Sequence, residues 1–255
     1  MDDATTEIYS AFFVEEEGTL SSLRGLQEVM ETQGLFSSLY TDRGSHYWLT
    51  EEAGGKVDKI RLTQVHRALQ QVGVTLIPAY SPEARGRSER VFRTLQDRLP
   101  KELALAGITE MAVANRYLTE QFLPQYNDRF MVPATEPGTA FIPWVGTNLA
   151  EILCVQDERV VAKDNTVRYQ GLSLQIPQDP HRFHYVKVTV RVHAYPDGTL
   201  AVFHGPRCLA RYDADGQLIE TGRAQPRRDG PTHGSDVPPI VHPRPTVRAT
   251  ISARG

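Results

Sequence analysis

The sequence predicts an α/β domain, then a small all-β domain and a disordered tail. Strand-like and helix-like runs alternate along roughly the first 145 of the 255 residues, the pattern of a sheet with helices on its faces. Short β-type runs separated by turn signals then follow within about seventy residues. From Arg223 onward the chain is rich in Pro, Gly and Arg and has few large apolar residues, as disordered segments do.

The first elements are predicted from the spacing of apolar residues. EIYSAFFVEE (7–16) is a β-type run rich in aromatic and apolar residues. LSSLRGLQEVMETQG (20–34) predicts an amphipathic helix that stops at Gly34. LFSSLYTD (35–42) predicts a strand that ends on an aspartate, Asp42.

The same alternation continues with two helices and one strand. RLTQVHRALQQVG (61–73) predicts a helix, and the mostly apolar VTLIPAY (74–80) predicts a buried strand. SPEARGRSERVFRTLQDRL (81–99) predicts a loop that leads into a helix, with Glu89 in the first turn. The predicted apolar stripe of this helix comprises Val91, Phe92, Leu95 and Leu99.

The predicted all-β domain is read from its turns. Asp-Gly pairs at 197–198 and 215–216 are strong hairpin signals, and about five short strands in this space favour a small barrel. We therefore expect domains at residues 1–145 and 146–222, with a disordered tail at 223–255. The tail carries six Arg and two Asp, and such a basic segment either adds DNA affinity or is a plain spacer.

Carboxylates follow comparable elements. If the helix at 61–73 is a crossover, Asp42 and Glu89 reach the same edge of the sheet. Asp2 or Asp3, which precede the first β-type run, would add a third oxygen ligand. Three carboxylates are suited to Mg²⁺ or Mn²⁺, and two such ions would assist phosphoryl transfer.

Arginines cluster around Glu89. Arg85 to Lys101 holds six basic and two acidic residues, and guanidinium groups bind phosphates well. Arg85, Arg87, Arg90 and Arg93 are therefore candidates for DNA contacts. The simpler interpretation of Glu89 is a helix-dipole residue paired with Arg93. His46 either touches the site or is an ordinary polar residue near it.

These motifs resemble a known family. YTDRGSHY (40–47) followed by SPEARGRSERVFRTLQDRL is similar to the second and third acidic motifs of the integrase catalytic core in DDE transposases of bacterial insertion sequences, above all the ISNCY group. DDAT (2–5) resembles the first motif. The resemblance implies a ribonuclease-H-like core, with Asp2, Asp42 and Glu89 as catalytic metal ligands, and selects Asp2 over Asp3. It covers roughly residues 2–218.

The resemblance also implies missing parts. Family members carry a strand and a helix-turn-helix region before the first aspartate, whereas here one residue precedes Asp2. We therefore expect a truncated core whose first strand is largely missing, a mobile Asp2 and a chain that is inactive alone.

Three functions remain open at this point. The first is a transposase that cleaves transposon ends and joins them to target DNA, as a homo-oligomer on DNA. The second is a non-catalytic remnant that binds DNA or poisons intact transposase, and the third is a metal-dependent nuclease of the same fold. No stretch is long and apolar enough for a membrane span, and the two cysteines lack metal-site spacing. Both features fit a bacterial cytoplasmic protein associated with the nucleoid.

Overall fold

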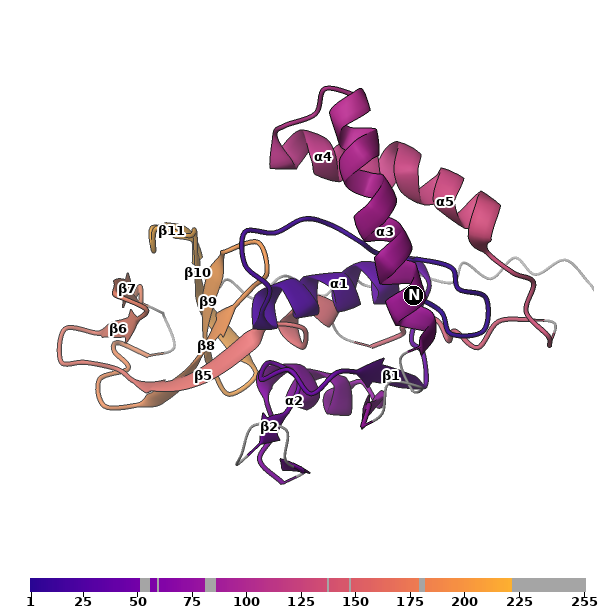
Figure 1. Cartoon of the computed structure of the whole chain (residues 1–255). Coiled ribbons are helices and arrows are strands. Elements are labelled where there is room, and N and C mark those ends of the chain that lie inside the picture. Colours follow the sequence, from indigo (N-terminus) through magenta and orange to yellow (C-terminus); the bar gives the residue numbers. More distant parts are fainter. Residues whose placement is uncertain are drawn as a thin grey trace, which may run out of the picture. The chain divides into compact units, whose positions relative to one another are not determined.

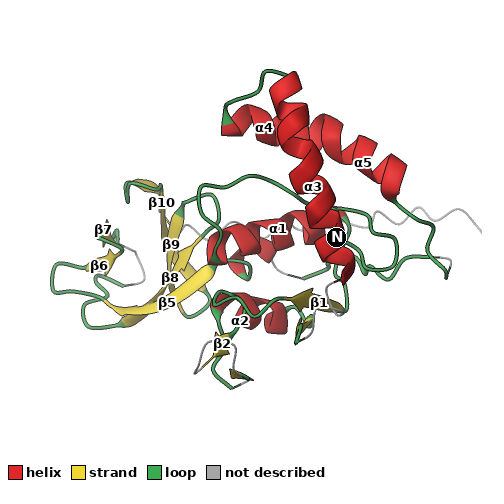
Figure 2. Ribbon diagram, in the orientation of Figure 1, coloured by secondary structure: helices red, strands yellow, loops and turns green. Residues whose placement is uncertain are grey.

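The computed structural model describes residues 1–50, 56–58, 60–80, 86–136, 138–146, 148–178 and 182–221. Helices and strands alternate in the first half, and strands dominate from residue 155 (Figures 1 and 2). The predicted mixed α/β class is therefore confirmed, whereas the ribonuclease-H-like arrangement stays a prediction. Arg85 and the predicted tail at 223–255 lie outside the described residues. None of the described helices is both long and apolar enough to cross a membrane.

The bounds of the elements are as follows. The helices are α1 (Thr19–Thr32), α2 (Gln64–Gln71), α3 (Gly86–Leu105), α4 (Met111–Tyr117) and α5 (Leu123–Phe130), with a π-helical turn η2 (Leu118–Phe122) and a 3₁₀ turn η3 (Leu149–Glu151). The strands of the first half are β1 (Ser38–Thr41), β2 (Leu49–Thr50), β3 (Val57–Asp58) and β4 (Thr75–Pro78). The later strands are β5 (Val155–Val160), β6 (Thr166–Tyr169), β7 (Leu172–Gln175), β8 (Thr189–Ala194), β9 (Leu200–His204), β10 (Arg207–Tyr212) and β11 (Leu218–Thr221).

Strands β1 and β4 pair in parallel, with Leu39 opposite Leu76. Their connection contains α2, as a parallel pair requires a crossover. Leu76 is buried in one apolar cluster with residues of α1 and α2, and Leu39 packs against that cluster. The predicted strand, crossover helix and strand are thus confirmed, and the carboxyl ends of β1 and β4 lie at one edge.

The end of α1 shows why the chain needs Gly34. Its φ is +107°, and a Cβ there would lie 2.7 Å from the carbonyl oxygen of Ile142. Leu35 and Ile142 exchange two backbone hydrogen bonds of 2.8 Å. The predicted helix stop is therefore confirmed, and the same glycine lets a distant segment approach β1.

Residues 7–16 do not form the predicted strand. Two asparagines of the helical region take the place of a neighbouring strand. Asn127 of α5 accepts from Ile8 N at 2.9 Å and donates to Ile8 O at 3.0 Å. Asn115 of α4 does the same with Phe13, at 2.6 and 3.1 Å. The segment has the composition of a strand, but its backbone groups form hydrogen bonds with side-chain amides instead of with a neighbouring strand.

Asn127→Ala should lower the free energy of unfolding by about 1 to 3 kcal/mol, because it leaves the N–H and C=O of buried Ile8 without these partners. Gln125→Ala, an exposed position of the same helix, is the matched control and should change little. Denaturant unfolding measures both, and equal effects would contradict this role of Asn127.

The apolar stripe of α3 differs from the prediction at one position. Val91 and Leu95 pack against the cluster that contains buried Leu99 together with residues of η2 and α5. Phe92, in contrast, is 54% exposed. Positions 91, 95 and 99 repeat every four residues and share one face, whereas position 92 lies about 100° away.

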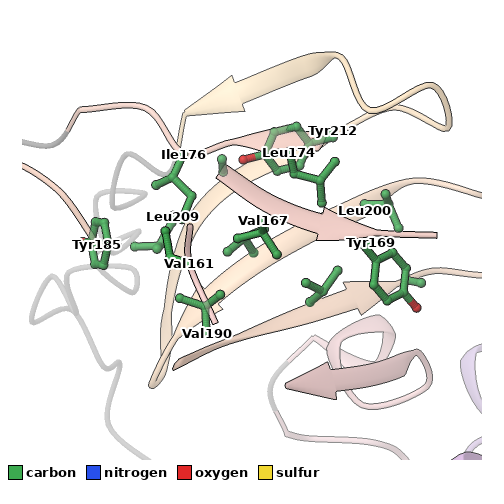
Figure 3. Packing of buried hydrophobic residues seen from close by; sticks show 14 residues of the cluster. Val161, Val167, Tyr169, Leu174, Ile176, Tyr185, Val190, Leu200, Leu209 and Tyr212 are labelled. Atoms are coloured by element: carbon green, nitrogen blue, oxygen red, sulfur yellow. The ribbon is translucent and has the colours of Figure 1, made fainter. Parts of the chain in front are cut away.

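The predicted barrel is an open sheet. Among the described residues, β11, β10, β9, β8 and β5 form one sheet in that order, and β5 does not pair with β11. The β6–β7 hairpin instead supplies Val167, Tyr169 and Leu174 to the cluster that holds Val190 and Leu200 of the sheet (Figure 3). The hairpin covers the apolar face, so the core can be closed without joining the edge strands.

Both Asp-Gly turns are confirmed. Asp197 and Gly198 connect β8 to β9, and Asp215 and Gly216 connect β10 to β11. Gly198 has φ of +87° and Gly216 has φ of +79°, which glycine adopts without steric cost. These turns therefore set the local pairing of four strands.

A carboxylate before the sheet makes a dense polar network. Glu151 lies 3.1 Å from His193 Nδ1 and accepts a 2.5 Å hydrogen bond from the Tyr195 hydroxyl. Its other oxygen accepts from Arg211. Glu151 thereby joins η3 to β8 and β10 through side chains 42 to 60 residues away.

Candidate active site

Asp42 directly follows β1, at the carboxyl edge of the parallel pair. Its Oδ1 accepts a hydrogen bond of 3.0 Å from Gly44 N. The turn after it is fixed by Trp48, which is buried and donates from Nε1 to the Thr41 hydroxyl at 3.0 Å. A rigid turn thus holds Asp42 where the sequence predicted it.

His46 lies in the same turn, with its ring 4.2 Å from that of Tyr47. Its Nε2 is buried and makes no hydrogen bond with any of the described residues. The nearest carboxylate oxygen given for it is Glu17 Oε1, at 3.7 Å. The His46 side chain is only 16% exposed. His46 is therefore a mostly buried residue of this turn rather than an exposed polar one.

Asp2 belongs to a closed turn. Its N–H donates to Glu7 O at 2.8 Å, and its carbonyl accepts from Thr6 N at 3.0 Å. The carboxylate accepts from the Thr5 hydroxyl at 2.6 Å and from Thr5 N at 3.1 Å, and from Ala4 N at 3.3 Å. Burial raises the pKa of Asp2, but these hydrogen bonds outweigh it and leave the pKa below its usual value.

Contacts with two distant helices fix this turn. Val132 N, just after α5, donates to Thr5 O at 2.9 Å, and the Thr6 hydroxyl donates to Phe130 O at 3.1 Å. Arg87 Nη1 of α3 donates to the Asp3 carbonyl and lies 3.3 Å from Asp3 Oδ2. We expected Asp2 to be mobile, whereas the structure holds it in an ordered turn.

Helix α3 carries the remaining candidates. Glu89 lies in its first turn, and Glu89, Arg87, Arg90 and Arg93 are all exposed. Arg90 Nε contacts Gly86 O at 3.2 Å within the helix. This end of α3 therefore presents one carboxylate among three arginines to solvent.

The candidate metal ligands are carboxylates, which suit a divalent cation, but the structure does not bring them close together. Throughout the described ranges, no three His, Cys, Asp or Glu side chains lie close enough together to hold one metal ion. Arg87 does link the Asp2–Glu7 turn to α3. Asp42 lies at the carboxyl edge of the β1–β4 pair, and α3 is the next helix of the chain after β4. Asp2 accepts three hydrogen bonds, so about one of its four acceptor positions remains.

Thr5, which orients Asp2, was not among the residues predicted from the sequence. The signal was present, because a hydroxyl residue three positions after an aspartate is typical of a local side-chain-to-backbone turn. Arg43 was not predicted either; its guanidinium lies 5.4 Å from the ring of Tyr80, which is 55% exposed. That contact joins the ends of β1 and β4 and has no local sequence signature.

Comparison with known proteins gives two relatives, whereas no protein-family model matches. The chain is 30% identical over 206 residues to y4bF of Sinorhizobium fredii, a protein named as a transposase; the match covers 79% of this chain and 44% of y4bF. It is 29% identical over 130 residues to the transposase for insertion sequence IS1202 of Streptococcus pneumoniae, covering 51% and 28%. The chain spans less than half the length of these relatives. The chain is therefore homologous to one part of each of these two proteins, which are named transposases.

Proposed function

We propose that this chain is the catalytic part of a DDE-type transposase of the ISNCY group, which cleaves DNA at transposon ends and joins them to target DNA. The observation that carries the proposal is the placement of Asp42 and Glu89. They follow two paired parallel strands of a chain that is related to transposases. The same relationship favours DNA as the partner and a homo-oligomer assembled on it.

In this proposal Asp2, Asp42 and Glu89 hold two Mg²⁺ or Mn²⁺ ions. The ions would stabilise charge on the attacking and leaving oxygens of the phosphate. The side chains must converge further than they do in the structure, and DNA binding at the same edge is the event we expect to bring them together. Thr5 orients Asp2, as a hydrogen-bonded outer shell does for metal ligands in general.

Arg87, Arg90 and Arg93 of α3 would contact the DNA backbone, together with Arg85. Mutating Arg90 and Arg93 to Ala should weaken binding to all DNA sequences and reduce the slope of log affinity against log salt by roughly one per lost phosphate contact. Lys101→Ala is the matched control, because Lys101 lies on the same helix but pairs with Asp97 at 2.6 Å. Fluorescence anisotropy at several salt concentrations measures the slopes. Equal slopes in the double variant and the wild type would place these arginines outside the DNA path.

The function is tested with labelled DNA from the ends of the element, Mn²⁺ and an unlabelled target. The assay uses the chain alone and, where the gene continues in frame upstream, the extended protein. Cleavage at the ends followed by strand transfer supports the proposal. DNA binding without cleavage in either form would favour the non-catalytic remnant, and cleavage without sequence preference or transfer would favour a nuclease.

A further inference from the structure

We propose that Tyr80 and Phe92 bind unpaired bases of a DNA strand by stacking, in the segments that carry the candidate carboxylates. This inference rests on the proposed function, because it names a further part of the DNA that the same site would hold. Base stacking requires neither a metal ion nor cleavage, so a binding experiment tests it separately.

Exposed aromatic residues occur mainly in the segments that carry Asp42 and Glu89. Throughout the described ranges, the aromatic residues that are more than half exposed are Tyr40, Tyr80, Phe92 and Phe183. Tyr40 lies two residues before Asp42. Phe92 lies three residues after Glu89, and Tyr80 follows β4, the strand before α3. A single exposed aromatic residue is ordinary, but three in these segments indicate a ligand with flat apolar faces.

Phe92 has charged and polar neighbours on the surface of α3. Residues three and four apart on a helix are neighbours, so Phe92 lies beside Glu89 and Gln96, both of which are exposed. By the same spacing, exposed Arg93 lies beside Glu89. An apolar protein partner that covered Phe92 would also have to bury these charges. A DNA strand instead offers a base to the ring and a phosphate to the guanidinium.

The ring of Tyr80 is held by a cation and stays open to solvent. The guanidinium of Arg43 lies 5.4 Å from the centre of the ring, within the range of a cation–π interaction. The backbone beside it is fixed, since Ala79 N donates to Thr41 O at 2.9 Å. More than half of Tyr80 is nevertheless exposed. A base can therefore stack on a ring that is already in place, next to a positive charge.

The other two exposed aromatic residues differ from this pair. Tyr40 lies within β1 and has Ile77 as its direct cross-strand neighbour, and side chains in such positions interact with each other. Phe183 lies between β7 and β8, next to Arg182 in the sequence. Phe183 thus combines an exposed ring with a neighbouring arginine, but no candidate carboxylate lies near it in the chain. It is the matched control.

The test compares three DNA ligands by fluorescence anisotropy in EDTA: a blunt duplex, the same duplex with a single-stranded end, and that duplex with abasic sugars in the single-stranded end. The abasic end keeps the phosphates, so the ratio of the last two affinities measures contacts with the bases. The wild-type chain should prefer the end with bases. Phe92→Ala and Tyr80→Ala should each lower this preference by about 5- to 100-fold, the range expected for one stacked base.

The variants separate stacking from other causes. Phe92→Trp and Tyr80→Phe keep a ring and should keep the preference, whereas Phe92→Leu keeps only apolar volume and should lose it. Phe92→Ala should leave the affinity for the blunt duplex within about twofold and the salt slope unchanged, because no phosphate contact is lost. Phe183→Ala should behave as the wild type.

Each contrary result has a distinct meaning. Equal wild-type affinity for the ends with and without bases would overturn this inference and leave the proposed function standing. Equal losses in Phe92→Ala and Phe183→Ala would overturn the placement of stacking beside Glu89. Loss of self-association in Phe92→Ala by light scattering, with the preference for bases intact, would assign the ring to a protein contact instead. A preference for bases without cleavage at the ends of the element would keep the stacking residues and overturn the proposed cleavage.

Discussion

In the protein extended upstream, Glu89→Gln should abolish metal-dependent DNA cleavage while the fold and DNA binding persist. The substitution keeps the shape of the side chain and removes the charge that a divalent cation requires. Glu89 is exposed in the first turn of α3, where its effect on the helix dipole is worth at most about 1 kcal/mol. A helix-dipole role therefore predicts a small loss of stability and full activity, whereas a ligand role predicts a loss of cleavage on the order of 10³-fold.

The control for this experiment lies on the same helix. Asp97→Asn removes an exposed carboxylate that pairs with Lys101 and should leave cleavage unchanged. Rates of strand cleavage in Mn²⁺, thermal unfolding and DNA affinity are measured for both variants. Normal cleavage by Glu89→Gln would end the assignment of Glu89 as a metal ligand and return it to the simpler interpretation.

Glu151→Gln should lower the free energy of unfolding by about 2 kcal/mol at neutral pH, because it leaves the charge of Arg211 without its carboxylate. The same carboxylate makes stability depend on pH. Burial raises the pKa of Glu151, but the hydrogen bonds from His193, Tyr195 and Arg211 outweigh it and lower the pKa to about 2.

The direction of the pH effect follows from that lowered pKa. Stabilisation by Glu151 is complete above its ordinary pKa of 4.5 and is lost as the pH falls towards about 2. The full shift corresponds to about 3 kcal/mol, and partial access of solvent to Glu151 reduces the expected effect to about 1 to 2 kcal/mol. The difference in unfolding free energy between wild type and Glu151→Gln should therefore shrink below pH 4.

Denaturant unfolding between pH 7 and pH 2.5 measures this difference. Glu158→Gln is the control, because Glu158 is an exposed carboxylate of β5 in the same sheet. Its difference from the wild type should stay small at every pH. A Glu151→Gln difference that does not change with pH would show that the network does not depend on the ionised carboxylate.

Local rules were enough to determine several elements from the sequence by itself. The stop of α1 at Gly34, the crossover between β1 and β4 and the two Asp-Gly hairpins were all predicted. Each depends on residues within one helix period, one strand or one turn, where spacing and backbone conformation dominate the energy. For the same reason the positions of Asp42, after β1, and Glu89, at the start of α3, could be predicted.

Only the tertiary structure decided the rest. Asn127 and Asn115 take the place of a strand beside Ile8 and Phe13. Arg87 reaches Asp3 across 84 residues, and Arg211 reaches Glu151 across 60. The β6–β7 hairpin covers an open sheet instead of leaving the strands to close a barrel. In each case a polar or apolar group has several possible partners along the chain. Which partner each group has depends on the segments that the packed helices and sheets bring together. The spacing of residues in the sequence does not predict this.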